Sequence, residues 1–222
     1  TFDHSLRTLE NVLDNCKNKI EKFIYFSSSM VYGNFKAEEV DENYNCDPLG
    51  IYAALKFSGE KIVKAYGQVF DLNYTIIRPS ALYGERCISR RVGQIFIENA
   101  LSKIDLRIDG DGEEKLDFTY INDLVTGVRK IIETNKSDKE TFNITYGSSR
   151  KINQMLDILK IHFNDLKVTY KKRDKLVPIR GTLNIDKAKD LLNYEPCWSL
   201  EKGYPNYIKW YKDLYKTFDE NK

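Results

Sequence analysis

The sequence predicts an α/β fold built on a doubly wound parallel sheet, followed by a smaller α/β lobe. Two observations lead to this prediction. Apolar runs at 23–26 and 72–77 flank a helical window at 52–70, and this strand–helix–strand order is typical of parallel strands joined by a right-handed crossover. The first run is continuously apolar, as is usual for a strand that helices cover on both faces.

The other elements are predicted in chain order. Apolar residues at three- and four-residue steps from Leu6 to Ile20 indicate an amphipathic helix before the first strand. Aromatic residues at helical spacing near the end, such as Tyr204 and Tyr207, are expected to pack a last helix on the core. After Gly84 we expect helices at about 92–103, 122–134, 152–164, 186–193 and 199–216, and short strands including 106–108 and 142–144.

The composition indicates a folded chain without a surface of one charge. The 222 residues are 41% hydrophobic and carry 35 Lys and Arg against 33 Asp and Glu, a net charge of +2. This balance argues against nucleic-acid or membrane-surface partners. The four cysteines are widely spaced, and neither a membrane span nor a signal peptide is recognisable. The sequence therefore predicts a cytoplasmic protein with reduced thiols and no metal site.

Several kinds of site are disfavoured. The only histidines, His4 and His162, stand near no recognisable Ser or Cys nucleophile, which argues against a hydrolase. The segment 110–112 has two glycines but not the third that a phosphate-binding loop needs. Two glutamates follow it and would repel an anion, so this segment is rejected as a phosphate-binding loop. The acidic segment 105–114 lacks the alternating ligands of a calcium loop and is expected to form a solvated hairpin.

Tyr52 and Lys56 are the strongest candidates for chemistry. A Tyr-x-x-x-Lys pattern places both side chains on one helix face, where the ammonium favours the phenolate and makes Tyr a usable base. The same spacing occurs at Tyr32 and Lys36. Gly and Asn follow Tyr32 directly and indicate a loop, in which a four-residue spacing does not place two side chains on one face. The cluster Ser27–Ser29 ends the preceding strand, at the sheet edge where open α/β folds bind ligands.

Six motifs follow one another along almost the whole chain. They are SSSMVYG at 27–33, DPLGIYAALK at 47–56, RPSALYG at 78–84, GDG at 110–112 with DFTYIND at 117–123, NIDKA at 184–188 and LNYEP at 192–196. Together they resemble the extended short-chain dehydrogenase/reductase family, and within it the nucleotide-sugar epimerase/dehydratase branch typified by UDP-glucose 4-epimerase.

The resemblance implies NAD as the cofactor, with NADP left open, and it assigns roles to particular residues. Tyr52 would be the acid/base for a sugar hydroxyl, and Lys56 would bind the nicotinamide ribose and stabilise the phenolate. Ser28 would be the assisting hydroxyl. Pro79 and Ser80 would lie beside the nicotinamide ring.

The resemblance also implies a division into domains. Residues 1–83 would be the later part of a Rossmann-type NAD(P)-binding domain, and residues 84–222 mainly a substrate-binding lobe, with 117–146 returning to the first domain. Such a relative also needs an initial strand and a G-x-x-G-x-x-G turn for the pyrophosphate. Neither occurs in the 222 residues, so the chain is expected to be N-terminally incomplete and, as it stands, to bind its cofactor weakly and not turn over.

The substrate implied by the resemblance is a nucleotide-diphosphate sugar lying across the second lobe. The cluster of Arg86, Arg90 and Arg91 is suited to gripping a diphosphate. UDP-hexose epimerases typically carry Asn at the position of Ala81 and Arg at that of Leu116, so two polar contacts are absent here. The predicted substrate residues are Ser28, Ser29, Ala81, Arg86, Arg91 and Arg180, with Lys115 and Arg173 as alternatives.

Two related reactions are disfavoured by particular positions. The 4,6-dehydratases need an Asp-Glu pair where this chain has Ser29 and Met30, and fucose-synthase-like enzymes need Cys and His where it has Met30 and Arg86. The sequence therefore predicts an NAD-dependent oxidoreductase or epimerase acting at C4 of a UDP- or GDP-linked hexose or heptose in polysaccharide biosynthesis. An NADPH-dependent 4-keto-sugar reductase and a catalytically silent dinucleotide-binding protein stay open. The resemblance also implies a homodimer.

Overall fold

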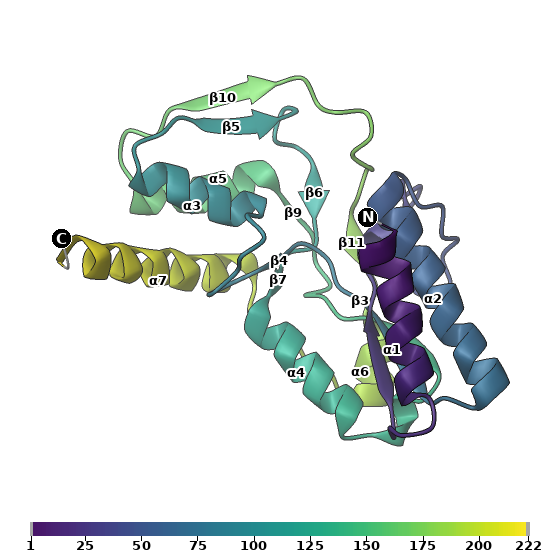
Figure 1. Cartoon of the computed structure of the whole chain (residues 1–222). Helices are drawn as coiled ribbons and strands as arrows, with labels where there is room; N and C mark the ends of the chain where they lie inside the picture. Colours follow the sequence, from purple (N-terminus) through teal and green to yellow (C-terminus); the bar gives the residue numbers. More distant parts are fainter. Residues whose placement is uncertain (1, 221–222) are drawn as a thin grey trace.

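The chain forms two lobes (Figure 1), and the computed structural model describes residues 2–220, with side chains up to Thr217. The α-helices are α1 (Thr8–Cys16), α2 (Ile51–Phe70), α3 (Val92–Leu101), α4 (Ile121–Ile132), α5 (Ile152–His162), α6 (Asp186–Leu192) and α7 (Leu200–Glu220). The strands are β1 (Phe23–Phe26), β2 (Glu39–Val40), β3 (Tyr74–Arg78), β4 (Leu82–Tyr83), β5 (Leu106–Asp109), β6 (Lys115–Leu116), β7 (Thr119–Tyr120), β8 (Glu140–Asn143), β9 (Arg150–Lys151), β10 (Val168–Lys171) and β11 (Thr182–Leu183). Short π-helical and 3₁₀ turns cover Asp3–Arg7, Ser29–Tyr32 and Asn135–Ser137.

A three-stranded parallel sheet in the order β1-β3-β8 organises the first lobe. Helix α2 is the crossover between β1 and β3, as the strand–helix–strand pattern predicts. The pairing matches Phe26 with Ile77 and Arg78 with Asn143, so all three strands end at one edge. The carboxyl ends of the strands therefore present their following loops side by side.

Helices cover this sheet on both faces, which confirms the doubly wound α/β class. Because side chains alternate along a strand, Ile76 and Ile77 of β3 point to opposite faces. Ile76 packs with Leu13 of α1 and Val63 of α2. Ile77 packs with Leu124 of α4, on the face that α6 also covers. Both faces of β3 are fully buried, which explains why this stretch of sequence shows no polar alternation.

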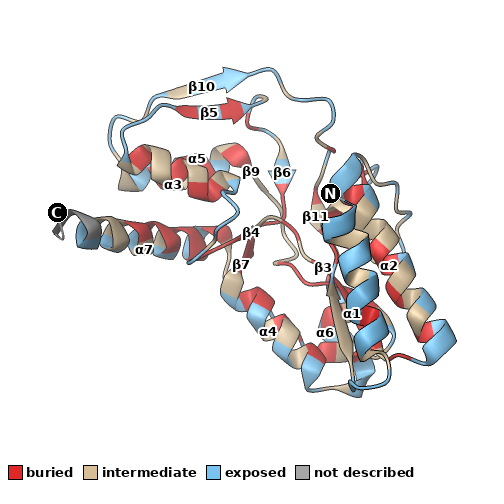
Figure 2. Ribbon diagram, viewed as in Figure 1, coloured by how far each residue is buried: buried red, intermediate tan, exposed pale blue. Residues whose placement is uncertain are grey.

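The second lobe packs α3, α5 and α7 with the parallel pair β5 and β10. Figure 2 shows buried residues along β5 and along one side of α7. Tyr204 and Tyr207 of α7 are fully buried in this core, so the prediction that the aromatic residues of the last helix pack on the core is confirmed. The same core includes Phe96 of α3 and Met155 of α5.

The predicted hairpin at 105–114 is wrong. Strand β5 pairs in parallel with β10, and β6 pairs with β9, so the two strands around the acidic turn do not pair with each other. The alternating burial of β5 reflects a sheet with one covered face, and its partner comes from residues 168–171, far along the chain. Local sequence carries no signal for such a distant pairing.

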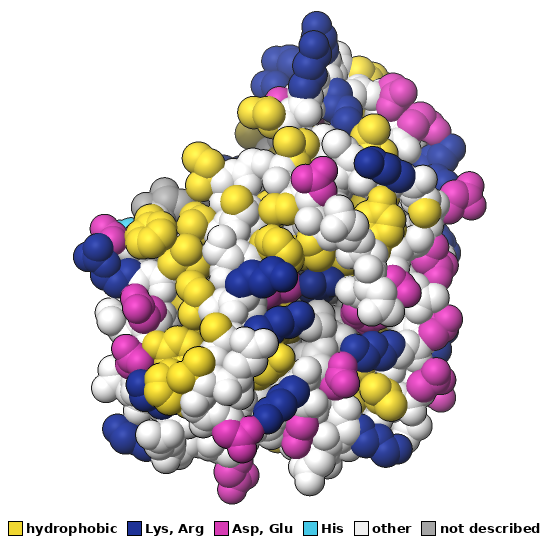
Figure 3. Space-filling model, turned by 90° about the vertical axis from the view of Figure 1, so that its right-hand side faces the viewer, with side chains coloured by type: hydrophobic (Ala, Val, Ile, Leu, Met, Phe, Trp, Pro, Cys, Tyr) yellow, Lys and Arg dark blue, Asp and Glu magenta, His cyan; other side chains and the backbone are white. Residues whose placement is uncertain are grey.

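The first helix is shorter than its apolar pattern predicts. Helix α1 ends at Cys16, after a π-helical turn at Asp3–Arg7, and Ile20 lies outside it and is exposed. Only Leu13 of α1 is fully buried, against α2 and the sheet. Figure 3 views the side of the molecule on which α1 and α2 lie, and it shows hydrophobic side chains scattered among Lys and Arg there. Among the described helices, none has the length and apolarity that crossing a membrane requires.

Candidate functional site

The candidate site begins where β1 and β3 end. The N–H of Ser27 donates to the carbonyl of Ile77 at 2.8 Å, and the N–H of Ser29 donates to the carbonyl of Pro79 at 2.9 Å. These bonds extend the pairing beyond the strands and bring the serine cluster against Pro79 and Ser80. The predicted hydroxyl cluster and the predicted nicotinamide neighbours therefore lie side by side, although they are about fifty residues apart in sequence.

Ser28 turns the chain at this edge. It has extended backbone geometry and caps the 3₁₀ turn Ser29–Tyr32, since its Oγ accepts the N–H of Met30 at 3.2 Å. Gly33 follows at a φ of +68°, and a Cβ there would collide with the carbonyl oxygen of Asp47. The turn after β1 is therefore held against the loop that leads into α2.

Tyr52 and Lys56 lie in the first turns of α2, which begins after Gly50. The Lys56 ammonium is 6.0 Å from the centroid of the Tyr52 ring, so the predicted shared helix face is confirmed by the geometry. The phenol is half exposed, with 52% of Tyr52 accessible, and is open to a ligand. Lys56 Nζ donates to the carbonyl of Phe26 at 2.7 Å, and its partial burial lowers the pKa of Lys56 below the usual value.

Tyr25 supports Lys56 from β1. Its hydroxyl donates to the Lys56 carbonyl at 3.4 Å, and its ring centroid is 5.4 Å from the Lys56 ammonium. Burial, with the nearby Glu60 carboxylate, raises the pKa of Tyr25 to about 12. Tyr25 therefore stays protonated at neutral pH and acts as a hydrogen-bond donor.

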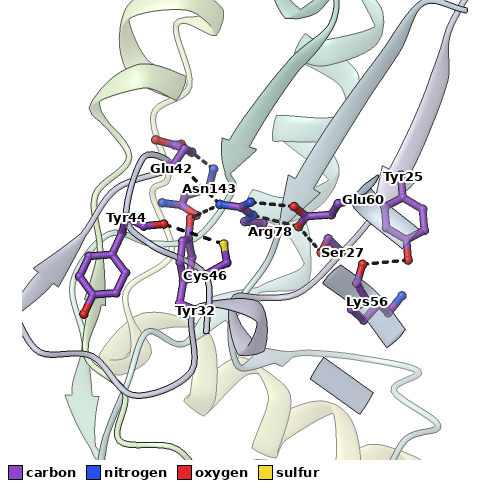
Figure 4. Close-up of polar contacts among 10 residues, drawn as sticks. All are labelled: Tyr25, Ser27, Tyr32, Glu42, Tyr44, Cys46, Lys56, Glu60, Arg78 and Asn143. Atoms are coloured by element: carbon purple, nitrogen blue, oxygen red, sulfur yellow. Dashed lines mark hydrogen bonds and ion pairs between the residues drawn. The ribbon is translucent and has the colours of Figure 1, made fainter. Parts of the chain in front are cut away.

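A buried polar network lies beside Lys56 and Tyr25 (Figure 4). Arg78 at the end of β3 forms a two-pronged ion pair with Glu60 of α2, at 2.9 and 2.7 Å, and Ser27 also donates to Glu60. Arg78 further donates to the Tyr32 hydroxyl at 3.0 Å, which donates to Asn143 of β8 at 2.7 Å. Tyr32 is fully buried here, so the Tyr32/Lys36 pattern is structural.

Sequence reasoning missed this network. Glu60 and Arg78 look like ordinary helix and strand charges, and only their spacing from Lys56 and Pro79 could have drawn attention to them. Each group is almost completely buried, with side-chain exposures of 0% for Glu60 and 4% for Arg78.

A pocket of about 360 Å³ opens in the second lobe. Ala81, Arg91 and Arg180, three of the predicted substrate residues, line it. The other lining residues are mostly apolar and include Val92, Phe96, Leu116, Phe118, Ile152, Met155 and Val177, together with Arg107, Asp109 and Glu114. An apolar cavity with a few charged groups at its rim suits a flat, partly apolar ring attached to an anionic group.

The predicted arginine cluster is divided by the fold. Arg91 precedes α3 at the pocket, and its Nε donates to Ser89 Oγ at 3.2 Å. Arg90 instead pairs with Glu98 of α3. Arg86 is exposed, in a left-handed backbone conformation with a φ of +63°, and is not among the residues that line the pocket in the described structure.

Arg180 connects the pocket with the turn after β1. Its guanidinium donates to Glu114 at 3.2 Å and contacts Met30 Sδ at 3.8 Å. Glu114 also faces Arg173 at 3.7 Å, so one carboxylate lies between two guanidiniums. Burial lowers the pKa of Arg180, and Nε of this side chain has no hydrogen-bond partner in the described part of the chain. The arrangement leaves positive charge available to an anion.

Asp117 fixes the backbone behind the pocket. Its carboxylate is fully buried and accepts the N–H groups of Leu183 and Gly147 and the hydroxyl of Thr145, each at 3.1 Å. These contacts tie residue 117, which stands between the pocket-lining Leu116 and Phe118, to residues 145–147 and to Leu183. Burial outweighs these hydrogen bonds and raises the pKa of Asp117 to about 6.

The residues present fit the nicotinamide half of a dinucleotide. A half-exposed phenol and an ammonium one turn away lie at the carboxyl edge of a parallel sheet, where such cofactors bind, and Lys56 bonds there to Phe26, two residues before Ser28. Lys56 has three donors and uses one on Phe26, which leaves others to hold ribose hydroxyls. Within the described residues no group of three or more His, Cys, Asp or Glu side chains could hold a metal ion.

This combination of fold and edge residues defines a short-chain dehydrogenase/reductase. A profile of the NAD dependent epimerase/dehydratase family matches residues 1–145, and the chain belongs to this family. Its relatives include an uncharacterised UDP-glucose epimerase of Bacillus subtilis, 32% identical over 96% of this chain and 68% of the relative. A putative UDP-glucose 4-epimerase of Methanocaldococcus jannaschii is 32% identical over 90% of this chain and 66% of the relative.

Solved structures show the same likeness. The UDP-glucuronic acid 4-epimerase of Bacillus cereus, crystallised with UDP-glucuronic acid and NAD, matches with a TM-score of 0.89 and 31% identity over 94% of this chain and 67% of that one. The UDP-glucose 4-epimerase of Thermotoga maritima, crystallised with UDP-glucose, matches with a TM-score of 0.86 and 29% identity over 93% and 68%. The chain is thus related to NAD-dependent enzymes that epimerise nucleotide sugars. The chain spans 68% of the length of the Bacillus subtilis relative and 52% of that of a UDP-glucuronate 4-epimerase of Arabidopsis thaliana.

The buried carboxyl of Asp117 makes a prediction about pH. Its folded-state pKa of about 6 lies above the unfolded value of 3.8, so between these values the folded state holds the proton more tightly. The free energy of unfolding should therefore fall as pH rises through this window, by about 3 kcal/mol. Urea unfolding of wild type and Asp117→Asn from pH 4 to pH 7 measures the difference, because the amide does not titrate. An identical pH dependence in the two proteins would contradict the prediction.

Proposed function

We propose that the protein interconverts the C4 epimers of a nucleotide-diphosphate sugar, with NAD as the hydride carrier. The observation that carries the proposal is the Tyr52–Lys56 pair, tied by Lys56 to the end of β1 just before Ser28, together with a second-lobe pocket that Arg91 and Arg180 help to line. Residues 1–83 would supply the nicotinamide half of the cofactor site and residues 84–222 most of the substrate site, with 117–146 returning to the first lobe. Relatives named as 4-epimerases of UDP-sugars support this reaction.

In this proposal Tyr52 removes the proton from the sugar hydroxyl. The phenol is half exposed, and the Lys56 ammonium beside it stabilises the phenolate and holds the ribose. Ser28 donates a hydrogen bond to the same sugar oxygen while its own Oγ is oriented by the Met30 N–H. Bound NAD would accept the hydride from the sugar carbon and return it to the opposite face. Pro79 and Ser80, held against the serine cluster, would exclude water beside the ring.

The pocket in the second lobe suits the nucleotide of such a substrate. Its apolar walls, including Phe96 and Phe118, would cover the base, and Arg91 and Arg180 would contact the diphosphate. Ala81 lines the same pocket and adds no polar group. Ser29, in the turn after β1, and Arg86, in the exposed loop before α3, would make further contacts with the substrate. The similar enzymes crystallised with UDP-sugars favour uridine over guanosine as the base.

Removing the phenol of Tyr52 should remove the acid/base. Tyr52→Phe is expected to lower kcat at least 100-fold, because general acid–base catalysis contributes about 10² to 10⁴ in rate. Turnover of the complete protein would be followed by chromatographic separation of UDP-glucose from UDP-galactose and of UDP-glucuronate from UDP-galacturonate, with NAD supplied. Tyr66→Phe is the control, since this phenol lies on the same helix and bonds to Asp14 on the surface. Substantial turnover by Tyr52→Phe would rule out the assigned role.

Removing the charge of Arg180 should weaken nucleotide binding. Arg180→Gln is expected to cost about 2 kcal/mol, or roughly 30-fold in the Kd of UDP, because hydrogen bonds to charged groups are worth about 1.5–3 kcal/mol. Isothermal titration with UDP measures the change. Arg129→Gln is the matched control, because Arg129 is exposed on α4 and pairs with Glu133 one turn along. An unchanged Kd would place the diphosphate elsewhere.

We also propose that two copies associate through α1 and α2. These helices expose large apolar side chains, among them Val12 at 47% and Val69 at 71%. Introducing charge there, in Val12→Glu/Val69→Glu, should convert a dimer into a folded monomer, because a charge buried without a partner is costly. Sedimentation velocity measures the mass. Ile161→Glu is the control, since Ile161 is 80% exposed on α5. A specific homodimer should persist at protein concentrations of tens of micromolar. Wild-type protein that sediments as a monomer at such a concentration would contradict the proposal.

A further inference from the structure

The catalytic helix carries three functional side chains on one stripe, and the third is buried. Tyr52, Lys56 and Glu60 are spaced by four residues, so they follow one another along the same side of α2. Their exposure falls along the stripe, from the half-exposed phenol through the partly covered ammonium to the fully buried carboxylate. The stripe thus runs from the ligand side of the sheet edge into the interior.

Each partner of the buried carboxylate is a direct neighbour of a proposed site residue. Glu60 accepts from Ser27, which precedes Ser28, and from Arg78, which precedes Pro79. One turn earlier on the helix, Lys56 donates to the carbonyl of Phe26, the residue before Ser27. Two successive turns of α2 are therefore tied to consecutive residues at the end of β1.

The network also reaches the third strand. Arg78 donates to Tyr32, whose hydroxyl donates to Asn143 at the end of β8, and the Asn143 amide donates to the carbonyl of Asn184. The guanidinium carbon lies 4.8 Å from the centroid of the Tyr32 ring. The carboxyl ends of all three strands are therefore joined to α2 by hydrogen bonds or ion pairs, that of β8 through Tyr32 and Arg78 (Figure 4).

Directional contacts fix the orientation of α2 on the sheet more closely than apolar packing does. Apolar side chains such as Val63 hold α2 on the sheet, but such packing tolerates small rotations and slides of a helix. A two-pronged guanidinium–carboxylate pair accepts only a narrow range of positions. A buried ion pair gives little net stability compared with apolar residues of the same volume, so stability alone does not account for it.

We propose that Glu60 and Arg78 are positioning residues. Their ion pair fixes the rotation of α2 about its axis and its position along that axis, so that Tyr52 and Lys56 face Ser28 and the bound nicotinamide. This inference rests on the proposed function for the identity of the reaction. Glu60 acts through the stripe that it shares with Tyr52 and Lys56, and Arg78 acts through its ion pair with Glu60.

The test removes the pair without leaving an unpaired buried charge. Glu60→Leu/Arg78→Met replaces both groups with apolar side chains of similar volume, and urea unfolding should give a stability close to that of wild type. In the ligand-free protein, 3-fluorotyrosine placed at position 52 reports the surroundings of that phenol through its ¹⁹F chemical shift. Displacement of the Lys56 ammonium, which lies 6.0 Å from the ring centroid in wild type, should move this resonance by more than its linewidth.

Turnover gives the second measurement. The double variant is expected to lose about 100-fold in kcat, the effect of a displacement of about 1 Å, with the Kd of UDP within about twofold of wild type. Thr75→Val is the matched control, because it removes a buried hydrogen bond to Ser137 at the opposite end of β3. That variant should change stability and leave both the ¹⁹F resonance and kcat unaltered.

The outcomes separate the two proposals. An unchanged ¹⁹F resonance in the folded double variant overturns the positioning role, whatever the turnover. A complete protein that epimerises no nucleotide sugar when NAD is supplied overturns the proposed function, and the ¹⁹F resonance still decides the position of the phenol. If the double variant does not fold, Ser27→Ala removes one arm of the network without exposing charge, and a smaller shift in the same direction supports the role. No shift in Ser27→Ala then overturns it.

Discussion

The ion pair between Arg78 and Glu60 is the constraint around which the first lobe is arranged. A buried guanidinium must be paired and its remaining donors satisfied, so Arg78 also draws in Tyr32 and, through it, Asn143. These partners come from the ends of two strands, a helix and a turn. Once they meet, the serine cluster, the Tyr52–Lys56 pair and the Pro79–Ser80 turn have little freedom left, because each adjoins a member of the network.

The second lobe is tied to this edge by polar contacts of the same kind. Asp117 collects two backbone amides and a hydroxyl from segments that are far apart in sequence, and Arg180 spans from Glu114 to Met30. The apolar pocket lies between these anchors. A ligand that places its anionic part near Arg180 is thereby brought close to the turn that carries Ser28.

Much of this fold could be predicted from local sequence. The apolar run 23–26 and the window 52–70 became β1 and α2 with nearly the expected bounds, because burial on both faces and a 3.6-residue period leave clear patterns. The hairpin at 105–114 failed because β5 finds its partner at 168–171, and pairing over such a distance has no local signature. The first helix was overextended because apolar spacing continues to Ile20 after the helix has ended.

The sequence by itself determined the doubly wound α/β class and the family, and it singled out the pair Tyr52 and Lys56, because one helical turn is a local geometry. Tertiary structure alone decided that Arg91 and Arg180 line one pocket while Arg86 lies outside it, since a guanidinium looks the same in sequence wherever it points. It also decided that Glu60 and Arg78 are buried partners. Burial and pairing depend on which strands and helices meet, and eighteen residues of chain separate these two groups.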